Sequence, residues 1–170
     1  MEKNEFKKLL FKVAFCSMAC DGHIDEREID EMKMMDKNTS FFHDIDLSEE
    51  LSELVSELGG KGVQIINDLF KTLKDNILNP IQELIILEVA LRIINADQKH
   101  DENEIKFIRF LRANLKLHDN EIVDRFGEID ILHTNSHVKN VVKGQNNKDF
   151  IKNLSLPEIN EIKKIKFNLE

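Results

Sequence analysis

One segment of this sequence occurs twice. Residues 12–32 (KVAFCSMACDGHIDEREIDEM) align with residues 88–108 (EVALRIINADQKHDENEIKFI) at an offset of 76 residues. The identical pairs are Val13/Val89, Ala14/Ala90, Asp21/Asp97, Asp25/Asp101, Glu26/Glu102, Glu28/Glu104 and Ile29/Ile105. Each copy reads as an apolar helix, a short acidic loop and an amphipathic helix. Because each unit would leave an apolar face uncovered, we expect the two to pack together about an approximate two-fold axis, with their acidic loops close.

Helical periodicity extends over most of the chain. Apolar residues recur at spacings of three and four, and glycine (6) and proline (2) are too scarce for the many turns of a sandwich or barrel. We therefore predict an all-α fold, a single bundle of about seven helices that contains the duplicated unit. The third predicted helix ends at Gly59-Gly60, the fifth begins at Asn79-Pro80, and the seventh covers 119–131.

The chain divides into a helical domain over residues 1–132 and a tail over 133–170. The tail begins with a polar stretch of poor periodicity, 133–149, and carries a short helix from about Leu156. The pattern leaves open whether this tail is docked or mobile.

The charge balance limits the function classes. A formal net charge of −8 argues against nonspecific nucleic-acid binding, because phosphates would meet a surface of like charge. Two cysteines cannot supply a disulfide framework, and no apolar run approaches the ~18 residues of a membrane helix. We expect a cytoplasmic protein.

The acids of each copy follow the pattern D-x-x-x-D-E-x-E. Asp25 with Glu28, and Asp101 with Glu104, are spaced as capping boxes, which explains these four residues without any function. Capping does not explain Asp21 and Asp97, because each ends a helix, where the dipole disfavours a negative charge. Two interpretations stay open, capping alone and capping combined with a divalent-cation site.

Such a site would draw its ligands from both loops. The candidate metal ligands are Asp21, Asp25, Glu28, Asp97, Asp101 and Glu104. Their hard oxygen donors favour calcium or magnesium. A working EF-hand is disfavoured because its first ligand positions would be Ser17 and Ile93. Cys16 and Cys20, with His23 nearby, lack a fourth partner for zinc and are better explained as core residues.

The two acidic segments resemble the tellurite-resistance TerB family. The matching residues are Ala19-Cys20-Asp21-Gly22 with Glu28, and Asn95-Ala96-Asp97 with Glu104, and the resemblance spans residues 5–132. Gln98 departs from the family pattern, which has glycine after the aspartate, and this substitution could shift the second turn. The resemblance implies an all-helical, non-catalytic module that binds a divalent metal through its acidic loops. It also implies a role in tellurite and stress responses, with protein partners in complexes near the inner face of the membrane.

Two other hypotheses remain. A metal-dependent hydrolase could use the same carboxylates, with His23 as the only histidine close to the acids in sequence. A helical adaptor without metal would use the acids for capping alone. The sequence contains no nucleophile elbow, phosphate-binding loop or HExxH motif, so we expect no enzymatic activity.

Overall fold

The structure is a computed structural model that describes residues 1–132 and 147–167. It is all-α, as predicted, and these two ranges contain no strand. The longer helices are α1 (Lys3–Ala19), α2 (Glu26–Asn38), α3 (Leu47–Lys61), α4 (Gln64–Asp75), α5 (Pro80–Ile94), α6 (Glu102–Asn114) and α7 (Asp119–Phe126). A 3₁₀ turn, η1 (Asp130–Leu132), and two short helices, α9 (Asn147–Lys152) and α10 (Ile159–Ile162), complete the order.

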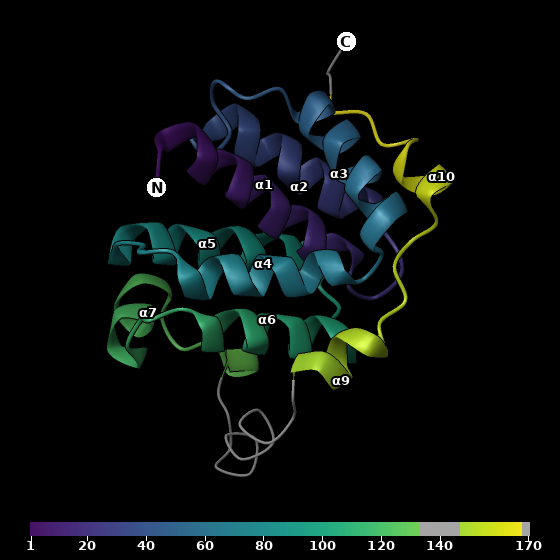
Figure 1. Cartoon of the computed structure of the whole chain (residues 1–170). Helices are drawn as coiled ribbons and strands as arrows, with labels where there is room; N and C mark the ends of the chain where they lie inside the picture. The colour runs from purple at the N-terminus through teal and green to yellow at the C-terminus, as the bar shows by residue number, and fades with distance from the viewer. Residues whose placement is uncertain (133–146, 168–170) are drawn as a thin grey trace.

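The two repeat units pack against each other through their first helices. α1 and α5 form the most extensive contact between elements, and they lie at the centre of the bundle (Figure 1). The second helix of each unit contacts the first helix of the other, since α2 contacts α5 and α6 contacts α1. This reciprocal exchange is the pattern that an approximate two-fold relation between the units produces.

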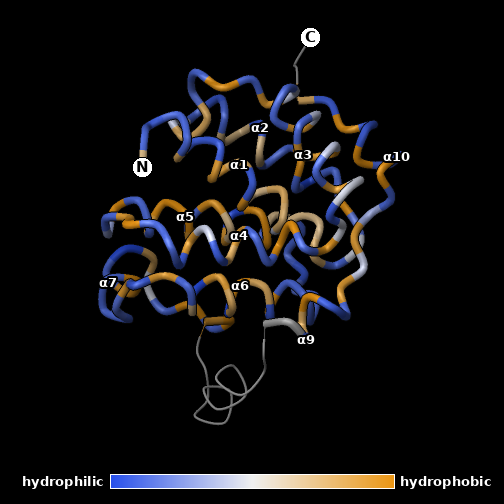
Figure 2. The backbone as a smooth tube through the Cα atoms, viewed as in Figure 1, coloured by the Kyte–Doolittle hydropathy of each residue, from blue (hydrophilic) through white to orange (hydrophobic). Residues whose placement is uncertain are grey.

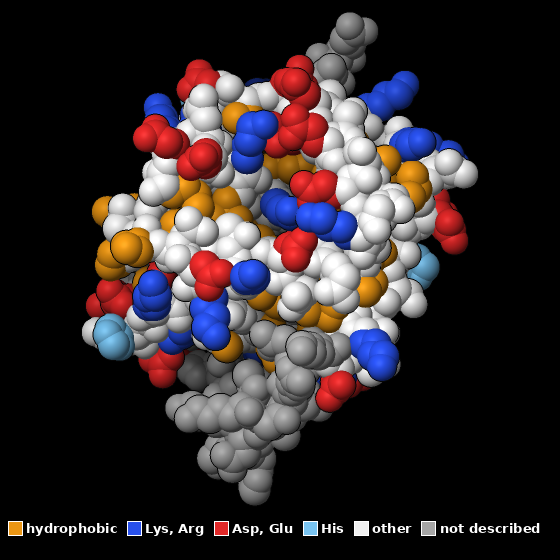
Figure 3. All heavy atoms as spheres, viewed as in Figure 1, with side chains coloured by type: hydrophobic (Ala, Val, Ile, Leu, Met, Phe, Trp, Pro, Cys, Tyr) orange, Lys and Arg blue, Asp and Glu red, His pale blue; other side chains and the backbone are white. Residues whose placement is uncertain are grey.

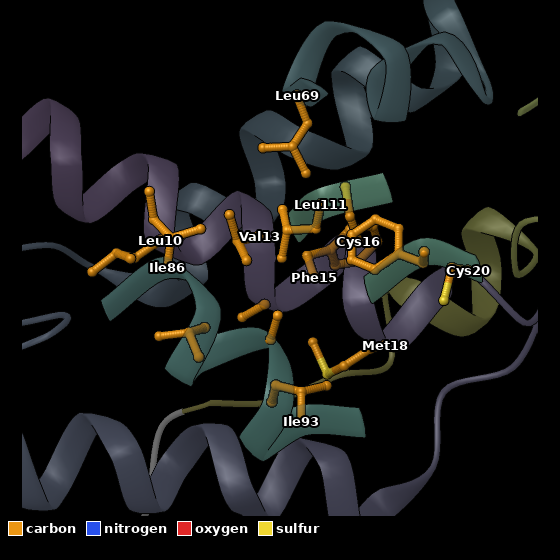
Figure 4. Close-up of a cluster of buried hydrophobic side chains, with 14 of the residues drawn as sticks. Leu10, Val13, Phe15, Cys16, Met18, Cys20, Leu69, Ile86, Ile93 and Leu111 are labelled. Atoms are coloured by element: carbon orange, nitrogen blue, oxygen red, sulfur yellow. The ribbon is translucent and has the colours of Figure 1, made fainter. Parts of the chain in front are cut away.

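The core follows from the apolar positions that the repeats share. Val13, Ala14, Val89 and Ala90 are fully buried, and the hydropathy of the chain is highest in the segments that cross the interior (Figure 2). Side chains from α1, α4, α5 and α6 meet there, among them Phe15, Met18 and Ile93 (Figure 4). Because both first helices are apolar around most of their circumference, they are enclosed by the other helices.

Two predicted helix ends are wrong, and glycine conformation explains both. α3 continues through Gly59 and Gly60 to Lys61, and the helix is stopped by Gly62, whose φ of +54° places it in the left-handed region. The seventh helix ends at Phe126 rather than near Ile131, because Gly127 has a φ of +74°. By contrast, α5 begins where Asn79-Pro80 predicts, with a capping box between Asn79 and Gln82.

The described part of the C-terminal segment, residues 147–167, is docked on the bundle, and we call it the C-terminal arm. Phe150 stacks on Phe110 of α6 with ring centroids 4.9 Å apart, and Phe167 meets Phe11 of α1 edge-on at 6.0 Å. The arm therefore shares one hydrophobic core with residues 1–132. The rest of the polar stretch, residues 133–146, lies outside the described residues.

The surface mixes charges of both signs. On the face with α1, α3 and α4, acidic and basic side chains alternate around a shallow hollow (Figure 3). Ion pairs line this hollow, between Lys8 and Glu50 at 2.8 Å and between Lys12 and Glu57 at 3.0 Å. Among the described residues, no helix is both long enough and apolar enough to cross a membrane.

Candidate functional site

Both predicted capping boxes are present. The Asp25 carboxylate accepts the backbone N–H of Arg27 at 2.9 Å, and Glu28 accepts the N–H of Asp25 at 2.9 Å. In the second copy, Asp101 accepts the N–H of Asn103 and Glu104 accepts the N–H of Asp101, both at 2.7 Å. These four acids fix the first turns of α2 and α6. The capping residues therefore hold the acidic loops in equivalent conformations.

The structure gives Asp21 and Asp97 a local role that the helix-dipole argument missed. Asp21 Oδ1 accepts the backbone N–H of His23 at 2.8 Å, and Asp97 Oδ1 accepts that of Lys99 at 2.9 Å. Each is an Asx-turn, in which an aspartate bonds to the backbone two residues on. The D-x-x spacing before each capping box was the signal that could have predicted these turns.

The second turn is not shifted by the residue that replaces glycine. Gln98 has a φ of +59° and Gly22, its equivalent in the first copy, has a φ of +88°. Both positions are left-handed, so the two acidic loops share one backbone path. The conformation costs Gln98 more than it costs Gly22, because a Cβ atom is disfavoured there.

Carboxylates of both loops come close enough to act on one another. Burial raises the pKa of Glu28 to about 8, and the charges of Glu104, Asp21 and Asp97 add to this effect. Burial likewise raises the pKa of Glu104 to about 7, with contributions from Asp21, Asp97 and Asp101. The pKa of Asp21 is also raised, by burial first and then by Asp101 and Asp97. Five of the six predicted ligands thus form one acidic cluster, Asp21, Glu28, Asp97, Asp101 and Glu104.

Asp25, the sixth predicted ligand, lies in a different environment. Arg27 binds both of its carboxylate oxygens at 2.9 Å and lowers its pKa to about 2. The same guanidinium reaches the Asp97 carbonyl oxygen of the other loop at 3.5 Å. Arg27 therefore links the two loops and binds both carboxylate oxygens of Asp25. In the second copy Asn103 stands at the position equivalent to Arg27, so Asp101 has no such arginine two residues on.

The acidic cluster has donors suited to a hard cation, but they are not arranged around a common point. No three histidine, cysteine, aspartate or glutamate side chains within residues 1–132 and 147–167 are placed to hold a metal ion together. Asp21, Glu28, Asp97 and Glu104 each use one carboxylate oxygen for a backbone N–H. Each keeps a second oxygen, so a cation would need these side chains to turn toward one another. The donor chemistry fits calcium or magnesium.

The cysteines are core residues, as predicted. Cys16 and Cys20 are free thiols with no exposed surface, and burial raises the pKa of Cys16 to about 12. A thiol with such a pKa carries a proton at neutral pH and is a poor ligand or nucleophile. His23 is exposed, and its backbone N–H is the group that bonds to Asp21.

The fold and the acidic loops define an all-α protein built around a duplicated acidic helix–loop–helix unit. Comparisons with protein-family models, curated proteins and solved structures give no match.

Proposed function

We propose that the protein is a TerB-like, non-catalytic module that binds calcium or magnesium between its two acidic loops. The observation that carries this proposal is that the two acidic loops lie side by side, with Arg27 reaching from one loop to the Asp97 carbonyl oxygen of the other at 3.5 Å. The acids of both loops contribute to the raised pKa values of Glu28 and Glu104. In this proposal Asp21 and Asp97, together with the free oxygens of Glu28 and Glu104, supply the ligands. Asp25 takes the separate role of binding Arg27.

Electrostatics favours a cation in this cluster. Two like charges 4 Å apart repel by about 4 kcal/mol at an effective dielectric constant near 20. The dipoles of α2 and α6 return about 1 kcal/mol or less at each loop. At Glu28 and Glu104, whose pKa values are raised to about 8 and about 7, a proton or a cation would relieve the repulsion. A divalent cation is the agent that would also join the two units.

The biological part of the proposal comes from the resemblance of residues 19–28 and 95–104 to the TerB family. We propose a role in tellurite or stress-response complexes, with protein partners near the inner face of the membrane.

The metal-free adaptor is the second candidate, and a specific observation favours it. Each acid of the loops already has a structural task, because Asp25 and Asp101 cap helices and Asp21 and Asp97 form Asx-turns. Selection for these turns alone could retain the repeated pattern. The hydrolase hypothesis has less support, because it needs a base beside the acids and the contact that His23 makes there is through its backbone.

Calorimetric titration of chelator-treated protein distinguishes the two candidates. We expect calcium or magnesium to bind the natural protein, and binding to be lost in the double variant Asp21→Asn/Asp97→Asn. Asparagine retains an oxygen that can accept the same backbone N–H, so both turns are kept.

The matched control is Glu26→Gln/Glu102→Gln. It alters another repeated pair of acids by the same charge, and both residues are exposed and absent from the acidic cluster. The control should bind like the natural protein. Absence of binding to the natural protein would favour the adaptor, and equal affinity in all three proteins would place the cation elsewhere.

A further inference from the structure

The C-terminal arm crosses the first acidic loop at Gly22. A Cβ atom at this position would lie 2.9 Å from the carbonyl oxygen of Ser155, closer than real Cβ atoms approach. Gly22 stands between Asp21 and His23, the two residues joined by the Asx-turn. The backbone of the arm therefore rests against the middle of a turn that carries a proposed ligand.

The second loop does not require glycine at the equivalent position. Gln98, which occupies the equivalent position with the same left-handed backbone, is exposed. The turn itself therefore tolerates a side chain, and the contact with Ser155 is what requires glycine in the first copy. This explains why the two copies differ at a position where their conformations agree.

The arm is anchored on both sides of this contact. Before it, Phe150 stacks on Phe110 and Leu154 is buried; after it, Ile162 is fully buried and Phe167 packs on Phe11. The arm runs from α9 beside α6, past α10, to the end of the molecule that carries α3 (Figure 1). Because both ends are fixed in the core, the segment at Ser155 cannot retreat from Gly22 without loosening the arm.

We propose that the C-terminal arm is a strap on the first acidic loop, and that docking of the strap opposes cation binding there. The cation part rests on the proposed function. To turn toward a cation shared with the second loop, the Asp21 carboxylate must move from its present position, in which Oδ1 accepts the N–H of His23 across Gly22. The Ser155 carbonyl oxygen packs against Gly22 in the middle of this turn, so movement of the turn presses on the arm and loosens the strap. By reciprocity, loosening the strap strengthens cation binding.

Amide hydrogen exchange tests the contact without any metal. We compare Gly22→Asn with the matched variant Gln98→Asn, since asparagine tolerates a left-handed backbone. Gly22 packs against Ser155 of the arm, whereas Gln98 is exposed. Gly22→Asn should speed exchange in the part of the arm on either side of the contact, residues 150–162, at least tenfold, while Gln98→Asn leaves it unchanged. Equal effects of the two variants would overturn the strap.

Phe150→Ala provides an independent route should Gly22→Asn fail to fold. Loosening the arm should speed exchange of the His23 amide, which bonds to Asp21, and leave the Lys99 amide, which bonds to Asp97, as in the natural protein. Equal acceleration of the two amides would indicate general destabilisation and contradict the proposal.

Calcium added to the natural protein completes the test. We expect faster exchange of residues 150–162 at calcium concentrations that saturate the calorimetric signal. Calcium binding with unchanged exchange of the arm would overturn the coupling and leave the proposed function standing. Loosening of the arm by Gly22→Asn in a protein that binds no calcium would support the contact and overturn the proposed function.

Discussion

Glu28 and Glu104 are each subject to two opposing influences on their charge. Each accepts a backbone N–H as the last member of a capping box, and each is buried among other carboxylates. The hydrogen bond favours the charged form, whereas burial and the neighbouring acids favour the neutral form, and the raised pKa values show that burial dominates. The pH dependence of the free energy of unfolding therefore tests the environment of these two glutamates.

Stability without divalent cations should fall as the pH rises from about 4.5 to 8. The pKa of Glu28 is about 8 in the folded protein against 4.5 as its ordinary value, so the folded state binds more protons across this window. Since ionisation then favours unfolding, Glu28→Gln should stabilise the protein at pH 8 by about 1 kcal/mol or more and flatten the pH dependence. Glutamine retains an oxygen for the capping bond. Denaturant unfolding at pH 5 and pH 8 measures both effects.

Glu102→Gln is the matched control for this prediction. It makes the same change of charge in the first turn of α6, but Glu102 is exposed and its pKa is lowered by its hydrogen bond to Lys106. It should give no stabilisation at pH 8. A gain equal to that of Glu28→Gln would mean that net charge, rather than the acidic cluster, controls the pH dependence.

At the scale of helices and loops, the hydrophobic pattern predicted which segments are helical better than where they end. Periodicity located α1 to α7, and the D-x-x-x-D-E-x-E pattern located both capping boxes. The ends of α3 and α7 were wrong because a glycine ends a helix only where the backbone becomes left-handed, which the residue type does not reveal. α9 was missed because Phe150 and Ile151, which it buries, follow a polar stretch and are too few to show a period.

The end of α3 gives a prediction at this scale. Gly59 and Gly60 are helical, exposed and have no atom within 4 Å of an added Cβ, so alanine at either position should stabilise the protein by about 0.5–1 kcal/mol. Gly62→Ala should instead destabilise it, because Gly62 has a positive φ. Thermal unfolding of the three single variants measures their order of stability. Destabilisation by Gly59→Ala would contradict the observed end of α3.

For the molecule as a whole, duplication explains the fold and the position of the candidate site together. α1 and α5 bury each other's apolar faces, and the reciprocal contacts of α2 and α6 bring the two loops to one place. The sequence predicted this convergence from the repeat. It could not predict that Arg27 would bridge the loops or that the arm would pack against Gly22 of the first loop, because both depend on contacts between residues distant in sequence.

The central claim is that the converged loops bind a divalent cation, and thermal unfolding tests it most directly. Melting temperatures of chelator-treated protein are compared in millimolar calcium or magnesium and in sodium chloride of matched ionic strength. Binding to the folded state at 100 times the dissociation constant would add about 2.7 kcal/mol to the free energy of unfolding. We predict a clearly larger rise in melting temperature with the divalent salt. An equal rise in both salts would show that screening of the −8 net charge is sufficient, and would contradict the cation site.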